Sequence, residues 1–238
     1  MSILHLQDVV KTFGHVRAVD GVSFSLEEGD HLALIGESGC GKTTLAKMMI
    51  GLIKPEGGFI TTDKCELQMI FQDPYSSLDP LWHVREILKE ALWRQRYLSA
   101  SQVQEKMEQM LVAVGLNPGV LQRFPHEFSG GERQRIAIAR ALLASPRILI
   151  LDEAVSALDT LVQKQILDLL KKIKQEFNLT YIFISHNLRL VRNFSDKIAV
   201  MYQGKIVEEG TVEAVLESPA HPYTQQLIQA AFYKDLAK

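Results

Sequence analysis

The chain has 238 residues and a mass of 26.8 kDa, the size of one large domain or of a domain with an insertion. Apolar residues make up 47% of it and charged residues 23%, which excludes a disordered or fibrous chain. Because 26 basic residues stand against 28 acidic ones, with a formal net charge of -2, nucleic acid is not expected as a partner. Two cysteines and the lack of an apolar run of roughly 18 residues predict neither a disulfide framework nor a membrane-spanning segment.

Strand and helix patterns alternate along most of the chain. Residues 4–10 and 22–26 are predicted to form an antiparallel β layer. Five short apolar runs without polar alternation, typical of strands buried on both faces, lie at residues 32–35, 67–71, 148–151, 181–184 and 198–201. Helical patterns lie at residues 43–50, 131–143, 160–177 and 188–194. This order predicts an α/β fold with a mainly parallel core sheet.

Residues 80–135 interrupt this alternation. Apolar residues recur at helical spacing over residues 84–97 and 101–114, with charged side chains between them. We therefore expect a single domain over residues 1–238, in which residues 1–79 and 136–238 form the core and residues 80–135 an inserted helical subdomain. A last helix is expected after the break at Pro219 and Pro222.

The strongest local pattern is a glycine-rich loop between the strand at 32–35 and the helix at 43–50. It matches G-x-x-x-x-G-K-[ST], in which backbone N–H groups and a helix N-terminus surround the phosphates of a nucleotide. Lys42 would bring its charge to the β- and γ-phosphates, and Thr43 its hydroxyl to Mg²⁺. The predicted ATP-binding residues of this loop are Gly36, Glu37, Ser38, Gly39, Cys40, Gly41, Lys42, Thr43 and Thr44. Cys40 is expected to fit as a small side chain, and activation of its thiol by Lys42 is the alternative.

A pair of acidic residues, Asp152 and Glu153, directly follows the apolar run at 148–151. Ligands gather at the carboxyl ends of the strands of a parallel sheet, so this pair and the glycine-rich loop should meet at one edge. We expect Asp152 to hold Mg²⁺ through its water shell. Glu153 is expected to polarise the attacking water.

These motifs resemble, in residue type and order, those of the ATP-binding-cassette ATPases over nearly the whole chain. The resemblance implies that Phe13 stacks on adenine and that Gln72 touches Mg²⁺ and the water. It also implies that His186 contacts the γ-phosphate, so Glu153, His186 and Gln72 are the predicted catalytic residues. Residues 128–132 resemble the signature loop of this family, and residues 156–159 its dimer-contact loop.

A second anion-binding site is predicted where residues 129–131 open a helix. One ATP needs only one anion-binding site of this kind. The presence of a second one indicates that ATP is shared between subunits. The resemblance implies two cassettes arranged head to tail, and the residues that would contact a partner subunit's ATP are Ser129, Gly130, Gly131, Glu132 and Asp159. Glu132 replaces the commoner Gln of the family and Asn187 the commoner Asp. We expect the first change to be tolerated because the backbone and Ser129 bind the phosphate.

Residues 72–80 and 221–224 resemble the ATPases of peptide and nickel importers. This resemblance implies a second, non-identical ATPase, two transmembrane permease subunits and an extracytoplasmic binding protein. The chain would then be a peripheral subunit on the cytoplasmic face of the cell membrane, and residues 73–81 would receive a short helix of the membrane subunit.

The predicted cargo is nickel, another transition metal or a metal chelate. Residues 39–41 and 153–156 are most similar to the second ATPase of nickel-type systems. Many relatives have Pro-Thr in place of Ala154-Val155. Import of oligopeptides or dipeptides is the alternative.

Three further alternatives keep the cassette and change its role. A soluble cassette of translation or DNA repair is disfavoured, because such relatives carry two cassettes or long coiled coils. An exporter ATPase shares the same chemistry, and association with an extracytoplasmic binding protein would separate the two directions of transport. A non-hydrolysing partner is disfavoured because Lys42, Asp152, Glu153 and His186 are all present.

Overall fold

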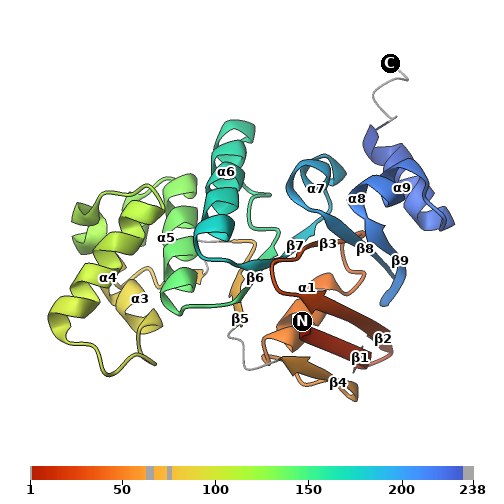
Figure 1. The fold of residues 1–238 in the computed structure, drawn as a ribbon, viewed down its shortest axis with the longest axis horizontal. Helices are drawn as coiled ribbons and strands as arrows, with labels where there is room; N and C mark the ends of the chain where they lie inside the picture. The colour runs from red at the N-terminus through yellow and green to blue at the C-terminus, as the bar shows by residue number, and fades with distance from the viewer. Residues whose placement is uncertain (1, 63–66, 74–76, 233–238) are drawn as a thin grey trace. The chain divides into compact units, whose positions relative to one another are not determined.

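The computed structural model describes residues 2–62, 67–73 and 77–232. The chain divides into two compact units, the first formed by Met1–Leu67 and Thr180–Lys238 and the second by Gln68–Leu179. Figure 1 gives the elements in chain order. Cys65, residues 74–76 of the segment expected to receive a membrane subunit, and the last part of the predicted final helix (233–238) lie outside the described residues.

An antiparallel sheet of three strands begins the first unit. β1 (Ser2–Phe13) lies between β2 (Val16–Glu27) and β4 (Gly57–Thr62), with Leu6 opposite Phe24 and Ile60. This confirms the predicted β layer and adds β4 to it. β4 has no fully buried residue, so its sequence carries no alternating pattern that would predict a strand.

A mainly parallel sheet forms the centre of the first unit. β3 (His31–Ile35) pairs in parallel with β7 (Thr180–Ser185) and with β8 (Lys197–Tyr202), and β9 (Lys205–Thr211) is antiparallel to β8. Every residue of β3 and β7 is buried, as predicted for strands covered on both faces. Ile35 lies opposite Ser185 in the register. The two loops that leave these strands therefore start side by side.

The described part of the first unit also contains the helices α1 (Lys42–Met49), α7 (Leu188–Phe194), α8 (Val212–Glu217) and α9 (Pro222–Phe232). α1 begins directly after the glycine-rich loop and buries Leu45, Ala46, Met48 and Met49. The ring of Phe194 packs edge-on against His31 at 4.4 Å and Phe183 at 4.9 Å between centroids. α9 confirms the predicted last helix over its described part.

The second unit contains the helical insertion. α3 (Val84–Ala91), α4 (Ala100–Ala113) and α5 (Gly130–Leu143) pack together (Figure 1), and two short 3-10 turns, Pro118–Gln122 and Pro125–Glu127, connect α4 to α5. The predicted presence of an inserted helical part is confirmed. Its boundaries at residues 80 and 135, and the division of the chain into core and subdomain, stay predictions.

The predicted helix over residues 84–97 is wrong at its C-terminal end, because α3 stops at Ala91. The following amides bond three residues back, as in Trp93 N–H to the Glu90 carbonyl and Gln95 N–H to the Leu92 carbonyl. Ser99 then caps α4 with a reciprocal capping box, which fixes a new helix start. The chain therefore turns where helical periodicity alone predicts continuation.

The remaining elements of the second unit are β5 (Leu67–Ile70), β6 (Ile148–Asp152) and α6 (Thr160–Glu176). β5 and β6 are neighbouring strands, and α6 packs against α5. All five residues of β6 are buried, as its apolar sequence predicts. Over the described part of the chain, no helix is long and apolar enough to cross a membrane.

Candidate nucleotide-binding site

The loop between β3 and α1 has a backbone that only glycine tolerates at two positions. The φ angles are 150° at Gly36 and 114° at Gly41. A Cβ atom would lie 2.2 Å from the Met201 carbonyl oxygen at the first position and 2.0 Å from the Ala18 carbonyl oxygen at the second. Since both neighbours are backbone atoms of strands, no side-chain movement could make room. The predicted strand–loop–helix arrangement is present.

Lys42 is the central cation of this loop. Its side chain is only 5% exposed, and Nζ donates to the carbonyl oxygens of Gly36 at 2.8 Å and Glu37 at 2.7 Å. Both of these partners are neutral, so neither cancels the charge of the ammonium group. The buried Cys40 lies beside it, with Sγ 3.6 Å from Nζ.

The loop fits the phosphates of a nucleotide. Gly41 is the N-cap residue of α1 and contributes no side-chain cap to the first turn, and the dipole of such a helix N-terminus favours an anion. The glycines keep side chains out of the curve of the loop, and Lys42 supplies the positive charge. Thr43 is exposed at the second position of α1, which suits a hydroxyl that would reach a hydrated Mg²⁺.

Tyr223 holds the start of the loop, a contact that the sequence did not predict. Its hydroxyl oxygen accepts a hydrogen bond from the backbone N–H of Glu37 at 2.8 Å. Its ring stacks on Tyr202 at 4.1 Å between centroids. The only sequence signal was the resemblance of residues 221–224 to importer ATPases, which gives the motif and not its contact with residue 37.

His186 follows β7 at the edge where the glycine-rich loop follows β3. Because Ile35 pairs with Ser185, His186 and Gly36 are the next residues on neighbouring parallel strands, as predicted from the sequence. His186 is exposed. Asn187, which departs from the family's Asp, accepts hydrogen bonds from the N–H groups of Arg189 and Leu190 and so caps α7. Asn and Asp are equally good in that role.

Phe13, the predicted adenine-stacking residue, ends β1 with its side chain 49% exposed. Lys11 places Nζ 5.3 Å from the ring centroid and pairs with Glu56 at 2.7 Å. The hydrogen bond from Lys11, together with one from the Thr12 N–H, holds the pKa of Glu56 below its usual range. One face of the ring thus has a cation near it. Stacking of adenine on Phe13 stays a prediction.

The acidic pair lies in the second unit at the end of β6. Asp152 is the last residue of the strand and is 4% exposed. Glu153 adopts a φ of 47°, a left-handed conformation that is rare for a residue with a side chain. The surrounding structure must enforce this conformation, and such strained residues concentrate at functional sites. Gln72 follows β5, the neighbour of β6, and is exposed.

The signature residues form the N-terminus of α5. Ser129 is its N-cap, and Glu132 closes a capping box by accepting from the Ser129 N–H at 2.9 Å and the Ser129 hydroxyl at 2.7 Å. These bonds hold the pKa of Glu132 below its usual range. Ser129 therefore donates its hydroxyl proton to Glu132, a contact the sequence did not predict.

The start of α5, which carries the signature residues, packs against the start of α6. A Cβ atom at Gly131 would lie 2.6 Å from Cγ1 of Val162 on α6, so glycine is needed for this approach. Asp159 caps α6 by accepting from the N–H groups of Leu161 and Val162 at 3.1 and 3.0 Å. Each unit thus assembles its own part of the predicted site: the glycine-rich loop with His186 in the first, and Gln72, Asp152, Glu153 and the signature in the second. The roles of these residues toward ATP, and the approach of one part to the other, stay predictions.

No cluster of three or more His, Cys, Asp or Glu residues that could hold a metal ion occurs among residues 2–62, 67–73 and 77–232. The described part of the chain thus offers no metal site of this kind besides the predicted ATP site.

Comparison with known proteins identifies the family. Residues 19–156 match the family model of the ABC transporters. The oligopeptide transport ATP-binding protein AppF of Bacillus subtilis (strain 168) is 44% identical over 256 residues, which covers 96% of this chain and 78% of that protein. The probable D,D-dipeptide transport ATP-binding protein DdpF of Escherichia coli (strain K12) is 47% identical over 222 residues, 92% of this chain and 72% of that protein. The chain belongs to the ATP-binding-cassette (ABC) transporter family and is an ABC ATPase.

Two solved structures share the fold. The cbiO1 protein of Clostridium perfringens, part of the ABC transporter complex cbiONQ, aligns with a TM-score of 0.81 over 97% of this chain and 96% of that one, at 23% identity. An ATP-binding cassette solved as a dimer in a post-hydrolysis state with ADP and Pi aligns with a TM-score of 0.78 over 88% of this chain and 98% of that one, at 26% identity. The predicted cassette fold and ATP binding are confirmed.

Proposed function

We propose that this chain is the ATP-hydrolysing subunit of an importer for short peptides. The glycine-rich loop with its buried Lys42 carries the ATPase part of the proposal. The names of the two relatives above, oligopeptide and D,D-dipeptide transport proteins, support peptides as the cargo. These relatives favour the peptide alternative over the metal cargo that the sequence motifs predict.

Each residue of the site would have a separate role in ATP hydrolysis. Lys42 and the N–H groups of the loop and of α1 would hold the β- and γ-phosphates. Glu153 would orient a water in line with the bond between the γ-phosphorus and the leaving oxygen of ADP, and would accept the proton that this water loses as the bond breaks. His186 would donate to a γ-phosphate oxygen, and Phe13 would stack on adenine.

Thr43 and Gln72 would hold Mg²⁺ directly, and Asp152 would hold it through a water molecule. When bound, the ion neutralises charge on the β- and γ-phosphates. The burial of Asp152 suits this role, because a nearby cation would offset the cost of burying a carboxylate.

The complete site would form between two cassettes. The N-terminus of α5, which lies apart in sequence from the glycine-rich loop, would bind an anion, and its Ser129, Gly130, Gly131 and Glu132 would face the ATP of a partner. Asp159 would contribute from the dimer-contact loop. The dimeric state of the structural relative with ADP and Pi supports pairing of two cassettes. The resemblance to importers implies that the partner would be a second, non-identical ATPase.

Two transmembrane permease subunits and an extracytoplasmic binding protein would complete the transporter. The chain would then be peripheral on the cytoplasmic face of the cell membrane. The groove beside Gln72 and residues 73–81 would receive a short helix of the permease, although residues 74–76 of that segment lie outside the described ones.

Import of nickel or a metal chelate is the second candidate. One observation favours it: residues 153–156, with Ala154 and Val155 after the acidic Glu153, resemble the second ATPase of nickel-type systems. The uptake experiment should therefore include both cargoes.

Uptake in a strain that lacks the chain tests the proposal. We expect uptake of a radiolabelled tripeptide to fall and to return with the wild-type chain but not with Glu153→Gln, while uptake of ⁶³Ni²⁺ is unchanged. Loss of nickel uptake alone would select the second candidate. Unchanged uptake of both would contradict both cargo assignments.

A further inference from the structure

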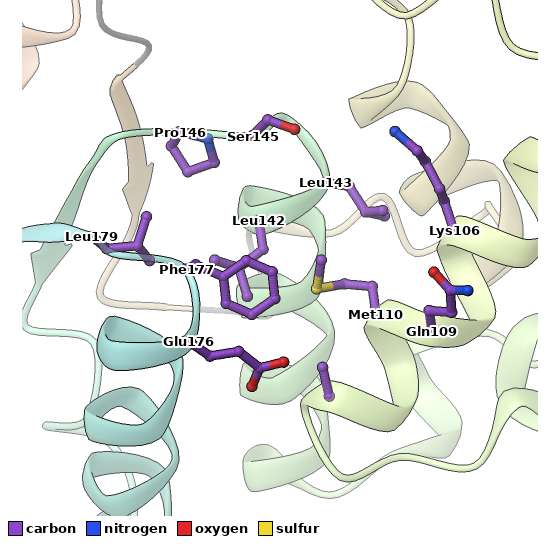
Figure 2. A pocket seen from close by; sticks show the side chains of 11 residues that line it. Lys106, Gln109, Met110, Leu142, Leu143, Ser145, Pro146, Glu176, Phe177 and Leu179 are labelled. Atoms are coloured by element: carbon purple, nitrogen blue, oxygen red, sulfur yellow. The ribbon is translucent and has the colours of Figure 1, made fainter.

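A cavity of about 480 Å³ lies within the second unit, away from every residue predicted to contact ATP. Figure 2 shows it between α4, the end of α5 and the end of α6. Its volume is in the range of small-molecule sites. No predicted role in ATP hydrolysis uses it.

The body of the cavity is apolar. Leu142 and Leu179 form buried parts of its wall at 3% and 1% exposure, and the ring of Phe177 is 37% exposed in it. Met110 of α4 and Phe177 both point into the cavity in Figure 2. An aromatic ring, a thioether and branched aliphatic side chains together form a surface that accepts apolar groups of varied shape.

A cation on α4 lines the cavity and is held in place. Lys106 donates from Nζ to Oε1 of Gln95 at 2.7 Å, and Gln95 donates from Nε2 to the Leu143 carbonyl at 2.8 Å. Because Gln95 is neutral, it positions the ammonium group without cancelling its charge. Two of the three hydrogens of this group remain for a ligand.

An anion on α6 lines the same cavity. Glu176 is the last residue of α6, where the helix dipole disfavours a negative charge. Within the described ranges, Glu176 has no hydrogen bond or ion pair and Lys106 has no ion pair. The cavity thus presents one positive and one negative group, from two helices, beside an apolar wall.

We propose that this cavity binds a short peptide with free termini and an apolar side chain. Its carboxylate would pair with Lys106, its ammonium group with Glu176, and its side chain would lie against Phe177 and Met110. The site follows from these residues alone, whereas the source of the ligand, peptide delivered by the transporter, rests on the proposed function. Ser129 is the N-cap of α5 and Asp159 the N-cap of α6, and these N-terminal ends carry the predicted contacts to a partner subunit's ATP. The ligand would contact the opposite, C-terminal ends of the same two helices.

Titration of the purified chain with the dipeptide Phe-Leu tests the proposal, with amide chemical shifts of residues that line the cavity as the readout. We expect saturable binding with a dissociation constant of about millimolar or tighter. N-acetyl-Phe-Leu-amide, which keeps the apolar body and lacks both charges, should bind at least about tenfold more weakly.

Two variants and a matched control locate the contacts. Lys106→Met and Glu176→Gln should each weaken Phe-Leu binding about tenfold or more. Lys164→Met removes an exposed cation of α6 outside the cavity and should leave binding unchanged. Glu176→Gln breaks no bond of the described chain, so its loss of binding could not be assigned to misfolding.

Absence of saturable binding, equal binding of the blocked peptide, or equal loss in Lys164→Met would overturn the proposal. The titration needs neither ATP nor the other subunits. A strain that imports peptides normally without this chain would therefore contradict the proposed function and leave the binding result standing.

Discussion

The hydroxyl oxygen of Tyr223 lies 2.8 Å from the backbone nitrogen of Glu37, to which it is hydrogen-bonded across 186 residues of sequence. The tyrosine belongs to the last helix and Glu37 to the phosphate-binding loop. Burial raises the pKa of Tyr223 and outweighs the opposing effect of this hydrogen bond, so the phenol stays protonated at physiological pH. The C-terminal helix thus fixes the start of the nucleotide site.

Tyr223→Phe should weaken ATP binding. The change removes the acceptor of the Glu37 N–H and keeps the ring that stacks on Tyr202. Loss of one hydrogen bond is expected to cost about 0.5–1.5 kcal/mol, which corresponds to an affinity about 2 to 10 times lower. Equilibrium binding of a fluorescent ATP analogue measures this.

Tyr202→Phe is the control for the tyrosine prediction. It removes a hydroxyl that accepts only from the neighbouring Gln203 in the described chain and keeps the stacked pair of rings. Its affinity should equal that of the wild type. An equal loss in both variants would mean that the hydrogen bond to Glu37 does not position the loop.

Gly41→Ala should abolish nucleotide binding. Its Cβ atom would lie 2.0 Å from the Ala18 carbonyl oxygen, at a φ of 114°. The matched control is Gly29→Ala, with a φ of 83° and no atom within 4 Å of the added Cβ. The control should lose about 1–2 kcal/mol of stability to backbone strain and still bind ATP, as measured by calorimetry at a temperature where both variants are folded.

Glu132→Gln should have a lower free energy of unfolding than the wild type at neutral pH. The difference between the two proteins should be smaller at acidic pH. Hydrogen bonds from Ser129 lower the pKa of Glu132 in the folded state below the ordinary value of 4.5. Its stabilising contribution is therefore complete above about pH 5 and is lost as the pH falls through the folded-state pKa.

Urea unfolding midpoints of both proteins between about pH 3 and pH 7 measure this effect. The wild type should be more stable by a few tenths of a kcal/mol, roughly, at pH 7, and the difference should shrink toward pH 3. A difference that does not change with pH would show that the carboxylate in the capping box carries no advantage.

The buried strands were predictable because each is a short apolar run that ends at a polar or glycine-rich turn. β3, β6 and β7 are fully buried, and the residues after them include Gly36, Glu153 and His186. The order of the motifs then gave the family. The signals for these strands and motifs lie within a few neighbouring residues, so a single sequence was enough to predict them.

The edge strands β4 and β9 and the end of α3 were not predictable in the same way. β4 and β9 carry no fully buried residue, since edge strands need no apolar pattern. In the turn after α3, the side chain of Gln95 donates to the Leu143 carbonyl, a contact between residues far apart in sequence. The contact between Tyr223 and Glu37 is likewise long-range, and no spacing in the sequence encodes it. The cargo was predicted from two short motifs, and the relatives favour the alternative.

Glu153, which directly follows the buried Asp152 at the end of β6, is the proposed base of ATP hydrolysis. Purified wild-type and Glu153→Gln chains should be compared for ATP binding and for release of phosphate in the same preparation. Gln keeps the size of the side chain and cannot accept the proton, so affinity should stay close to that of the wild type while turnover falls about 100-fold or more. Turnover of Glu153→Gln at the wild-type rate would contradict the role of Glu153 as the base.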